Sequence, residues 1–433
     1  MRICISIIFA AALLSAGRVK AGTPIADDVY DSNPNHLWNR LNKTLFERTA
    51  PDGKHYGLDQ LDILYWARTT NLLAGVSHQQ ALGVLDEFIN THGEKLIQDP
   101  LKIALLQRDL WTLFDWSVRM GNDDFAASRK ELQKRLAIAI QRLELTTNKI
   151  ASLSDNYVLA EKDNLTDLPS GLFNTNGDWI NIAIPNALGL VPAHGLSFGG
   201  RSVFIVLFHD AGGRKAGLDY LKEIHAIEPM YVSSGDTNDP IRLNHFPQFP
   251  TNSQWALVRR MRVIDTDGKI RTTHVVESIQ LRTYLGFGAP EYVEVTNVDG
   301  TVGSQTIPPQ RFNEFQMTRP SAKMISLGQR KRSFIKIPFS NGLDPFEFSG
   351  LGNERGSNVM SDPPIALQSC FQCHSQSEIY SVNSFTRVFS VGTSPETTDM
   401  VESDGSRDEE GFFSSKEMRA DWGLLQGLWM QNN

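Results

Sequence analysis

The first part of the chain carries hydrophobic residues at helical spacing, from about residue 33 to residue 162. Residues 101–120 are so rich in apolar side chains that a helix there must be largely buried. Residues 124–147 carry an apolar stripe at one helical face, made of Leu132, Leu136, Ala139, Ile140 and Leu143. Ser77-His78-Gln79-Gln80 has the spacing of a capping box, which predicts the start of another helix. The pattern therefore predicts an N-terminal α-helical domain.

After Asn164 the pattern changes to short runs of β-branched and aromatic residues separated by turn residues. The clearest signal is a pair of arms, residues 255–264 and 269–284, on either side of Asp265-Thr266-Asp267-Gly268, which is typical of a β-hairpin. A calcium loop is disfavoured there because no further ligands follow at the required spacing. Other strands are predicted at residues 178–182, 202–208, 292–295, 312–317 and 334–337. We expect a mainly antiparallel sheet.

The last part of the chain begins with a loop rich in Gly, Ser, Asn and Pro that ends in Asp362-Pro363-Pro364. Residues 392–411 are acidic and poor in apolar side chains, which predicts a mobile, solvated loop. Ser414-Ser415-Lys416-Glu417 is a second capping box, before a helix that carries Trp422, Leu424, Leu425, Leu428 and Trp429.

These patterns together predict an α+β protein with four segments. They are a signal peptide at residues 1–21, an α-helical domain at 22–163, a β-rich domain at 164–345, and a C-terminal segment at 346–433.

The chain starts with Met1-Arg2, an apolar run at residues 3–16, and small residues up to Ala21, which is typical of a secretory signal peptide. A membrane anchor is disfavoured because the run is shorter than the roughly 20 residues that a spanning helix needs. We therefore expect a periplasmic or secreted protein with no stable membrane insertion after cleavage. The net charge of −7 argues against a nucleic-acid partner.

Cleavage after Ala21 would remove Cys4 and leave two cysteines, both in the motif Cys370-Phe371-Gln372-Cys373-His374. Two thiols at this spacing are typical of c-type haem attachment, with the following histidine as an iron ligand. We expect one covalent haem c, bound by Cys370 and Cys373 through thioether bonds and by His374 as the metal ligand.

Three other interpretations of the motif are weaker. A disulfide between Cys370 and Cys373 would close a very small loop and stabilise little. A redox dithiol needs a strand before the motif and a helix at its first cysteine, whereas a Pro-Pro loop precedes it here. A zinc site needs further ligands, and there is no second cysteine pair.

The layout resembles the mostly-β c-type cytochromes, in which the CxxCH motif follows an antiparallel sheet near the C-terminus. The resemblance covers the order of elements and the run from Cys370 to Ser384-Phe385-Thr386-Arg387. That group includes enzymes that oxidise hydroxylamine with a lysine cross-linked to the haem, and gas-binding relatives. Here Lys323, Lys331 and Lys336 lie upstream of the motif, but the sequence singles out none of them as the cross-linker. The N-terminal helical domain of this chain is not part of that group of cytochromes. Arg330-Lys331-Arg332 is interpreted as a solvated basic patch or as compensation for haem propionates.

The second axial ligand of the iron decides between the candidate functions. Downstream methionines are Met400, which falls in the acidic loop, and Met418 and Met430, which we expect to pack in the last helix. Histidines of the sheet domain are further candidates: His194, His209, His225, His245 and His274. A six-coordinate iron favours electron transfer to a redox partner protein or small molecule. Alternatives are a haem oxidoreductase with an open distal position, acting on a small nitrogen compound or peroxide, and a haem-bearing protein that binds a partner.

Overall fold

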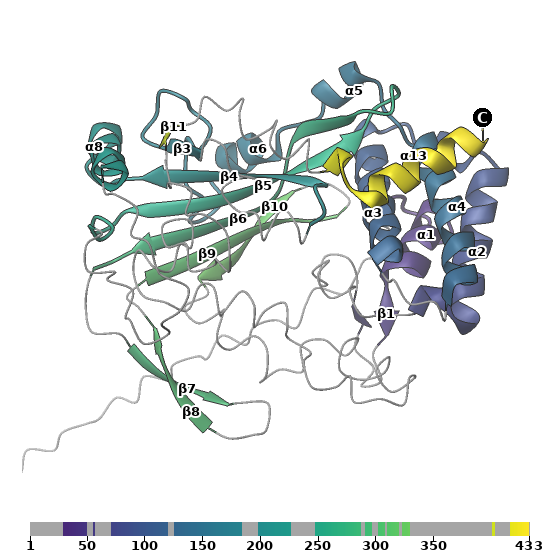
Figure 1. Ribbon diagram of the computed structural model, residues 1–433, viewed down its shortest axis with the longest axis horizontal. Coiled ribbons are helices and arrows are strands. Elements are labelled where there is room, and N and C mark those ends of the chain that lie inside the picture. Colours follow the sequence, from purple (N-terminus) through teal and green to yellow (C-terminus); the bar gives the residue numbers. More distant parts are fainter. Residues whose placement is uncertain are drawn as a thin grey trace, which may run out of the picture.

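A computed structural model of the chain describes residues 29–49, 55–56, 71–119, 125–183, 198–226, 247–286, 291–296, 302–307, 310–319, 323–329, 401–402 and 416–432. Along these residues helices come first and an antiparallel sheet follows, so the protein has the predicted α+β layout (Figure 1). The expected signal peptide, the strand at residues 334–337, and nearly all of the acidic loop lie outside the described residues.

The helical part is built from long helices joined by short turns. Its elements are α1 (Leu37–Phe46), α2 (Gly75–Asn90), α3 (Pro100–Arg119), α4 (Ala126–Arg142), α5 (Thr147–Ala151) and α6 (Asn156–Lys162), with 3-10 turns at Asn71–Leu73 and Gly93–Lys95. Two very short strands, β1 (Arg48–Thr49) and β2 (His55–Tyr56), pair with each other.

The predicted helix at residues 101–120 is confirmed as α3, and the apolar stripe of the next helix is buried in α4 as expected. The expected helix at 124–147 ends earlier, at Arg142, and Thr146 caps the separate helix α5 by accepting from the Lys149 amide. The capping box at Ser77 is wrong: α2 begins at Gly75 after Ala74, and the Ser77 hydroxyl donates to the Ala74 carbonyl.

The seven-stranded sheet has the order β10-β9-β6-β5-β4-β3-β11, and each neighbouring pair is antiparallel. Its strands are β3 (Ile180–Ala183), β4 (Ser202–His209), β5 (Gln254–Ile264), β6 (Ile270–Tyr284), β9 (Gln310–Met317), β10 (Met324–Gln329) and β11 (Val401–Glu402). The expected hairpin is confirmed as β5 and β6, and the expected strands at 178–182, 202–208 and 312–317 correspond to β3, β4 and β9.

Asp265 stabilises the turn of this hairpin. Its buried carboxylate accepts from the backbone amides of Asp267 and Lys269 and from Nε of Arg271. These contacts satisfy turn amides that the strands leave unpaired, which accounts for the acidic residue of the turn sequence.

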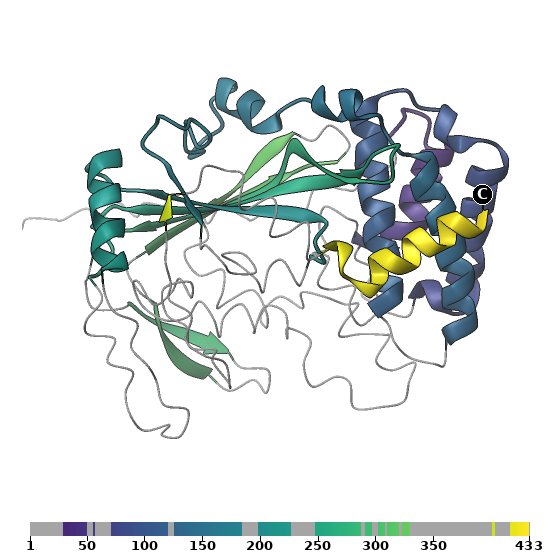
Figure 2. The same cartoon turned by 45° about the horizontal axis from the view of Figure 1, so that its top comes forward.

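Three elements inside the β-rich region were not predicted: the edge strand β10, one helix and one further strand. Helix α8 (Arg214–His225) follows β4, and strand β8 (Val302–Ile307) pairs with β7 (Glu291–Thr296), the predicted strand at 292–295, in a separate hairpin. Helices α5 and α6 lie along one face of the large sheet, and α8 lies across the end of β3 and β4 (Figure 2). The other face of the sheet is therefore not covered by α5 or α6.

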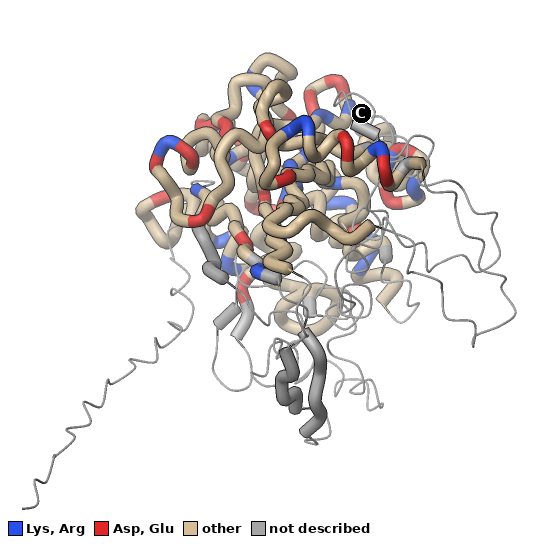
Figure 3. The backbone as a smooth tube through the Cα atoms, turned by 90° about the vertical axis from the view of Figure 1, so that its left-hand side faces the viewer, with Lys and Arg blue, Asp and Glu red and all other residues tan. Residues whose placement is uncertain are grey.

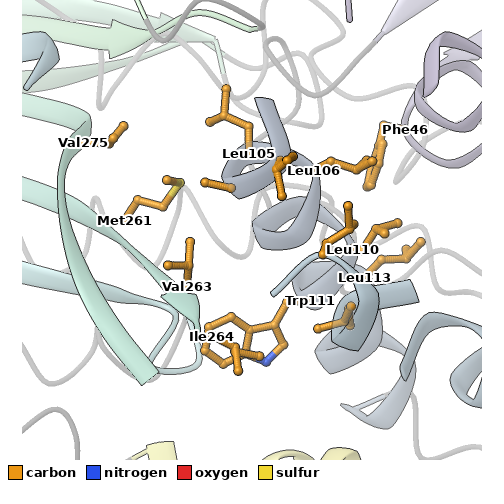
Figure 4. Packing of buried hydrophobic residues seen from close by; sticks show 14 of the residues in the cluster. Phe46, Leu105, Leu106, Leu110, Trp111, Leu113, Met261, Val263, Ile264 and Val275 are labelled. Carbon is orange, nitrogen blue, oxygen red and sulfur yellow. The ribbon is translucent and has the colours of Figure 1, made fainter. Parts of the chain in front are cut away.

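A single hydrophobic cluster runs through the helical part and the large sheet. Helix α3 lies at its centre, with Leu105 and Trp111 directed toward Met261, Val263 and Ile264 of β5 (Figure 4). On its other side Leu110 and Leu113 face the remaining helices. Because residues 103–117 of α3 are all buried, this helix joins the two halves of the fold.

The C-terminal helix α13 (Ala420–Asn432) returns to the helical part and packs against α3 and α4. The Trp422 ring lies 5.8 Å from the Trp111 ring, and Nε1 of Trp429 donates to the Ala137 carbonyl at 2.8 Å. The predicted last helix is thus confirmed, although Leu424 is exposed.

Candidate functional site

The predicted haem-binding residues Cys370, Cys373 and His374 lie outside the described residues, as do His194 and His245. Of the other candidate histidines, His209 ends β4 with its ring 5.2 Å from Trp179, and His274 is exposed on β6. His225 ends α8.

The expectation about the downstream methionines needs correction. Met418 and Met430 do not pack in the last helix: their exposed fractions are 83% and 75%. Met418 precedes α13, and Met430 lies on its solvent side. His78 is buried near the start of α2, and its Nδ1 lies 2.8 Å from the Leu72 carbonyl oxygen. His92 is exposed with a positive φ of 56°, beside Glu94.

The most concentrated group of buried charges in the described structure surrounds α3. This helix is buried on every side, yet it carries Arg108, Asp109 and Asp115. A buried charge is stable only when it is paired and hydrogen-bonded. Each of the three finds its partner on a different part of the fold, and we call the resulting group the α3 network: Arg108, Asp109, Asp115, Arg201, Ser202, Arg259, Glu277, Arg319, Lys416, Arg419 and Asp421.

Arg108 reaches the large sheet. Its Nη2 lies 3.2 Å from Oε1 of Glu277 on β6 and 3.0 Å from the hydroxyl of Ser202 on β4. The Ser202 hydroxyl donates to Oε2 of Glu277 at 2.5 Å, and Nε of Arg259 on β5 lies 3.4 Å from the same oxygen. Glu277 is therefore shared by two guanidinium groups.

Asp109 pairs with Arg319, which follows β9. Nε and Nη2 of Arg319 donate to the two carboxylate oxygens at 3.0 and 2.8 Å, in the two-pronged geometry that suits a guanidinium and a carboxylate. This pair attaches α3 to the β9 side of the sheet, 210 residues away in sequence.

Asp115 pairs with basic residues from two other parts of the chain, the C-terminal segment and the residue before β4. Nζ of Lys416 lies 2.5 Å from Oδ2 of Asp115, and Arg201 donates to the same oxygen. Nζ of Lys416 also lies 3.0 Å from Asp421, which contacts Arg419 in turn. The Lys416 and Asp115 side chains are fully buried, and Nζ lies 5.1 Å from the centre of the Trp111 ring.

Burial and charge shift the pKa values of this network in different directions. Burial raises the pKa of Asp109 above its usual value, although Arg319 opposes the shift. Burial would also raise the pKa of Glu277, but the positive charges of Arg108 and Arg259 outweigh it and hold that pKa below its usual value. Burial lowers the pKa of Arg108 to about 10, against the effect of Glu277 and with the help of neighbouring Arg201.

The network is a set of ion pairs rather than a metal centre. Among the described residues no group of three or more His, Cys, Asp or Glu side chains is arranged to hold a metal ion. None of the helices that the structure describes is both long enough and apolar enough to cross a membrane. Basic and acidic residues are interspersed over the described backbone (Figure 3).

Sequence patterns gave one weak signal for this network. A helix that is apolar all round but contains Arg108, Asp109 and Asp115 must satisfy those charges internally. The partners could not be named, because Glu277, Arg319 and Lys416 lie far away along the chain and no local motif relates them to this helix.

Comparisons with protein-family models, with curated proteins and with solved structures found no match to this chain.

Proposed function

We propose that the protein is an exported c-type haem protein that transfers electrons. One observation carries this proposal: Cys370, Cys373 and His374 form a complete haem-attachment motif, and the chain contains no other cysteine beyond Cys4. In this proposal the two thiols form thioether bonds with the haem, and the His374 imidazole binds the iron.

The redox role follows from the chemistry of the group that the motif would hold. A bound haem supplies an iron that gains and loses one electron, and the protein sets its potential through axial ligands, charge and burial. The partner would be a redox protein or a small molecule that exchanges electrons at the haem edge.

The proposed location outside the cytoplasm is supported by the start of the chain. A short basic start, an apolar run at residues 3–16 and small residues up to Ala21 are typical of an export signal. Export also suits the chemistry, because c-type haem is attached outside the cytoplasmic membrane.

The test is direct detection of covalent haem. The full chain is expressed in a host with a haem-attachment system, denatured, and examined by peroxidase-stained gel and by the pyridine haemochrome spectrum. We expect one haem per chain, and none in the Cys370→Ala, Cys373→Ala double variant. Cys4→Ala is the matched control and should retain the haem. A wild-type chain without covalent haem contradicts the proposal.

Spectra of the native protein then separate the functions. A six-coordinate low-spin iron in both oxidation states supports electron transfer. A high-spin iron that binds carbon monoxide or cyanide rapidly would contradict electron transfer and favour the oxidoreductase alternative.

A further inference from the structure

The described part of the chain contains five methionines, and they fall into two classes. Met261, Met317 and Met324 are at most 2% exposed, and all three belong to the main hydrophobic cluster. Met418 and Met430 are 83% and 75% exposed. Access to solvent therefore separates the five thioether groups into a buried class and a fully accessible class.

The buried methionines are part of the packing within the sheet and between the sheet and α3. Met261 of β5 lies in the contact between this strand and α3 (Figure 4). Met317 and Met324 are cross-strand partners on β9 and β10. An oxygen atom added to any of these sulfur atoms would enter a close-packed interior, where a polar group without a partner costs stability.

The exposed methionines lie at the two ends of α13, on the outside of the helical part (Figure 2). Met418 is in the turn before the helix, where the Arg419 amide donates to the carbonyl of the fully buried Lys416. Met430 directly follows the buried Trp429. Because the residues that hold the helix are buried and the two methionine side chains are exposed, a change confined to either sulfur atom leaves the docking contacts in place.

Packing does not account for a methionine at either position. Of the large hydrophobic side chains that are exposed in the described structure, Met418 and Met430 have the largest exposed fractions. A side chain this exposed gains almost nothing from burial of its apolar surface. Its sulfur distinguishes methionine from the other apolar residues, since a solvent-accessible thioether is readily oxidised to a sulfoxide.

We propose that Met418 and Met430 are sites of reversible oxidation by peroxides, and that the folded protein accepts both sulfoxides. With hydrogen peroxide, the lone pair of the sulfur attacks one oxygen, a sulfur–oxygen bond forms and the oxygen–oxygen bond breaks. The transferred oxygen gives its proton to the other oxygen, which leaves as water. The sulfur loses an electron pair and the peroxide gains it. An external reductant, through a methionine sulfoxide reductase, reverses the change.

The experiment treats the full-length protein with hydrogen peroxide and locates the added oxygen by mass spectrometry of its peptides. We expect Met418 and Met430 to be oxidised at least about tenfold faster than Met261, Met317 and Met324, because a buried sulfur reacts only when the fold opens locally. Urea denaturation before and after this treatment should give the same midpoint. A methionine sulfoxide reductase should then remove both added oxygen atoms.

Glutamine substitutions test separately whether each class tolerates a polar group. Glutamine is similar in length to methionine and carries a polar end, as the sulfoxide does. Met418→Gln and Met430→Gln should each keep the urea midpoint of the wild type. Met261→Gln is the matched buried variant and should lower the midpoint clearly, because it places an amide in the core.

Two results would overturn the inference. Oxidation of Met261 as fast as that of Met418 and Met430 would show that burial does not protect the sulfur. A lower urea midpoint after oxidation of only Met418 and Met430 would show that the sulfoxides disturb the docking of α13.

The Cys370→Ala, Cys373→Ala variant separates direct oxidation from a reaction of peroxide at a bound haem. The same selective oxidation of Met418 and Met430 in this variant supports direct oxidation, which needs no haem. Loss of that oxidation in the variant rejects it. Failure of the proposed haem attachment would leave the expected oxidation pattern unchanged, so the two proposals are tested independently.

Discussion

Asp115 and Lys416 form an ion pair in which both side chains are fully buried, although 301 residues separate them in the sequence. The pair fixes the segment before α13 against α3. Asp115 also accepts from Arg201, and Lys416 also contacts Asp421, so each charge has a second partner. Burying two ions costs several kcal/mol each, and only such multiple contacts offset that cost.

Asp115→Asn should therefore destabilise the protein strongly. The variant keeps the shape of the side chain but leaves Lys416 and Arg201 with less compensating negative charge. We expect a loss of about 3–5 kcal/mol in the free energy of unfolding, the range for breaking a buried ion pair. Urea denaturation followed by circular dichroism measures it.

The control is Asp219→Asn on α8. Asp219 contacts Lys215 at 2.5 Å, the same distance as in the buried pair, but the Lys215 side chain is 88% exposed. Water screens an exposed ion pair and leaves it little net effect on stability, so this variant should unfold almost as the wild type does. Similar losses in the two aspartate variants would contradict the role given to burial.

Gly200 lies where the start of β4 meets Lys416, and Gly200→Ala tests that contact. Its φ is +73°, and a Cβ atom there would lie 2.7 Å from Cβ of Lys416. Backbone strain and this clash should together cost about 1–3 kcal/mol of unfolding free energy. Gly83→Ala in α2, where a new Cβ meets nothing within 4 Å, should instead stabilise the protein by about 0.5–1 kcal/mol.

The elements that the sequence predicted well are those with strong local periodicity. α3, α4 and the β5–β6 hairpin have long apolar patterns or a clear turn, and the structure confirms their existence. α8 was missed because its apolar contacts come from a narrow stripe in a polar segment, Leu218, Leu221 and Ile224, between regions of strand pattern.

The α3 network could not be predicted, because its ion pairs join segments far apart in sequence. Asp109 and Arg319 are separated by 210 residues, and no local motif relates them. The proposed haem motif is the opposite case: Cys370, Cys373 and His374 lie within five consecutive residues, so the proposal of haem attachment needs no tertiary information.

Trp429 anchors α13, and its replacement should weaken the docking of the C-terminal helix. Its Nε1 donates to the Ala137 carbonyl, and its ring lies 6.0 Å from Trp422. Trp429→Ala removes a large buried side chain and should cost about 3–5 kcal/mol of unfolding free energy, whereas Trp429→Phe should cost about 1 kcal/mol through the lost hydrogen bond.

The neighbouring residue gives the control for this helix. Met430 is 75% exposed, so Met430→Ala should change the unfolding free energy by no more than about 0.5 kcal/mol. A large loss from Met430→Ala would mean that this methionine is buried in the folded protein, and the docking of α13 would need revision.

Glu144 makes the stability of the hairpin region depend on pH. Burial raises the pKa of Glu144 from 4.5 to about 8, and the negative charge of Asp265 acts in the same direction. Between these two values the folded protein keeps a proton that the unfolded chain releases. Stability from this group is therefore complete below pH 4.5 and falls as the pH rises toward 8.

Glu144→Gln should remove this dependence, because glutamine stays neutral in both states. The variant should match the wild type near pH 4.5 and be more stable at pH 8 and above, where the wild type holds an ionised carboxylate beside Asp265. Urea denaturation at several pH values measures the difference. Glu223→Gln on the exposed side of α8 is the control and should leave the profile as it is in the wild type. The prediction is contradicted if the unfolding free energies of Glu144→Gln and the wild type differ by the same amount at every pH in this range. Glu144 would then have the same protonation in the folded and unfolded states, because only a group that binds protons differently in the two states makes stability depend on pH.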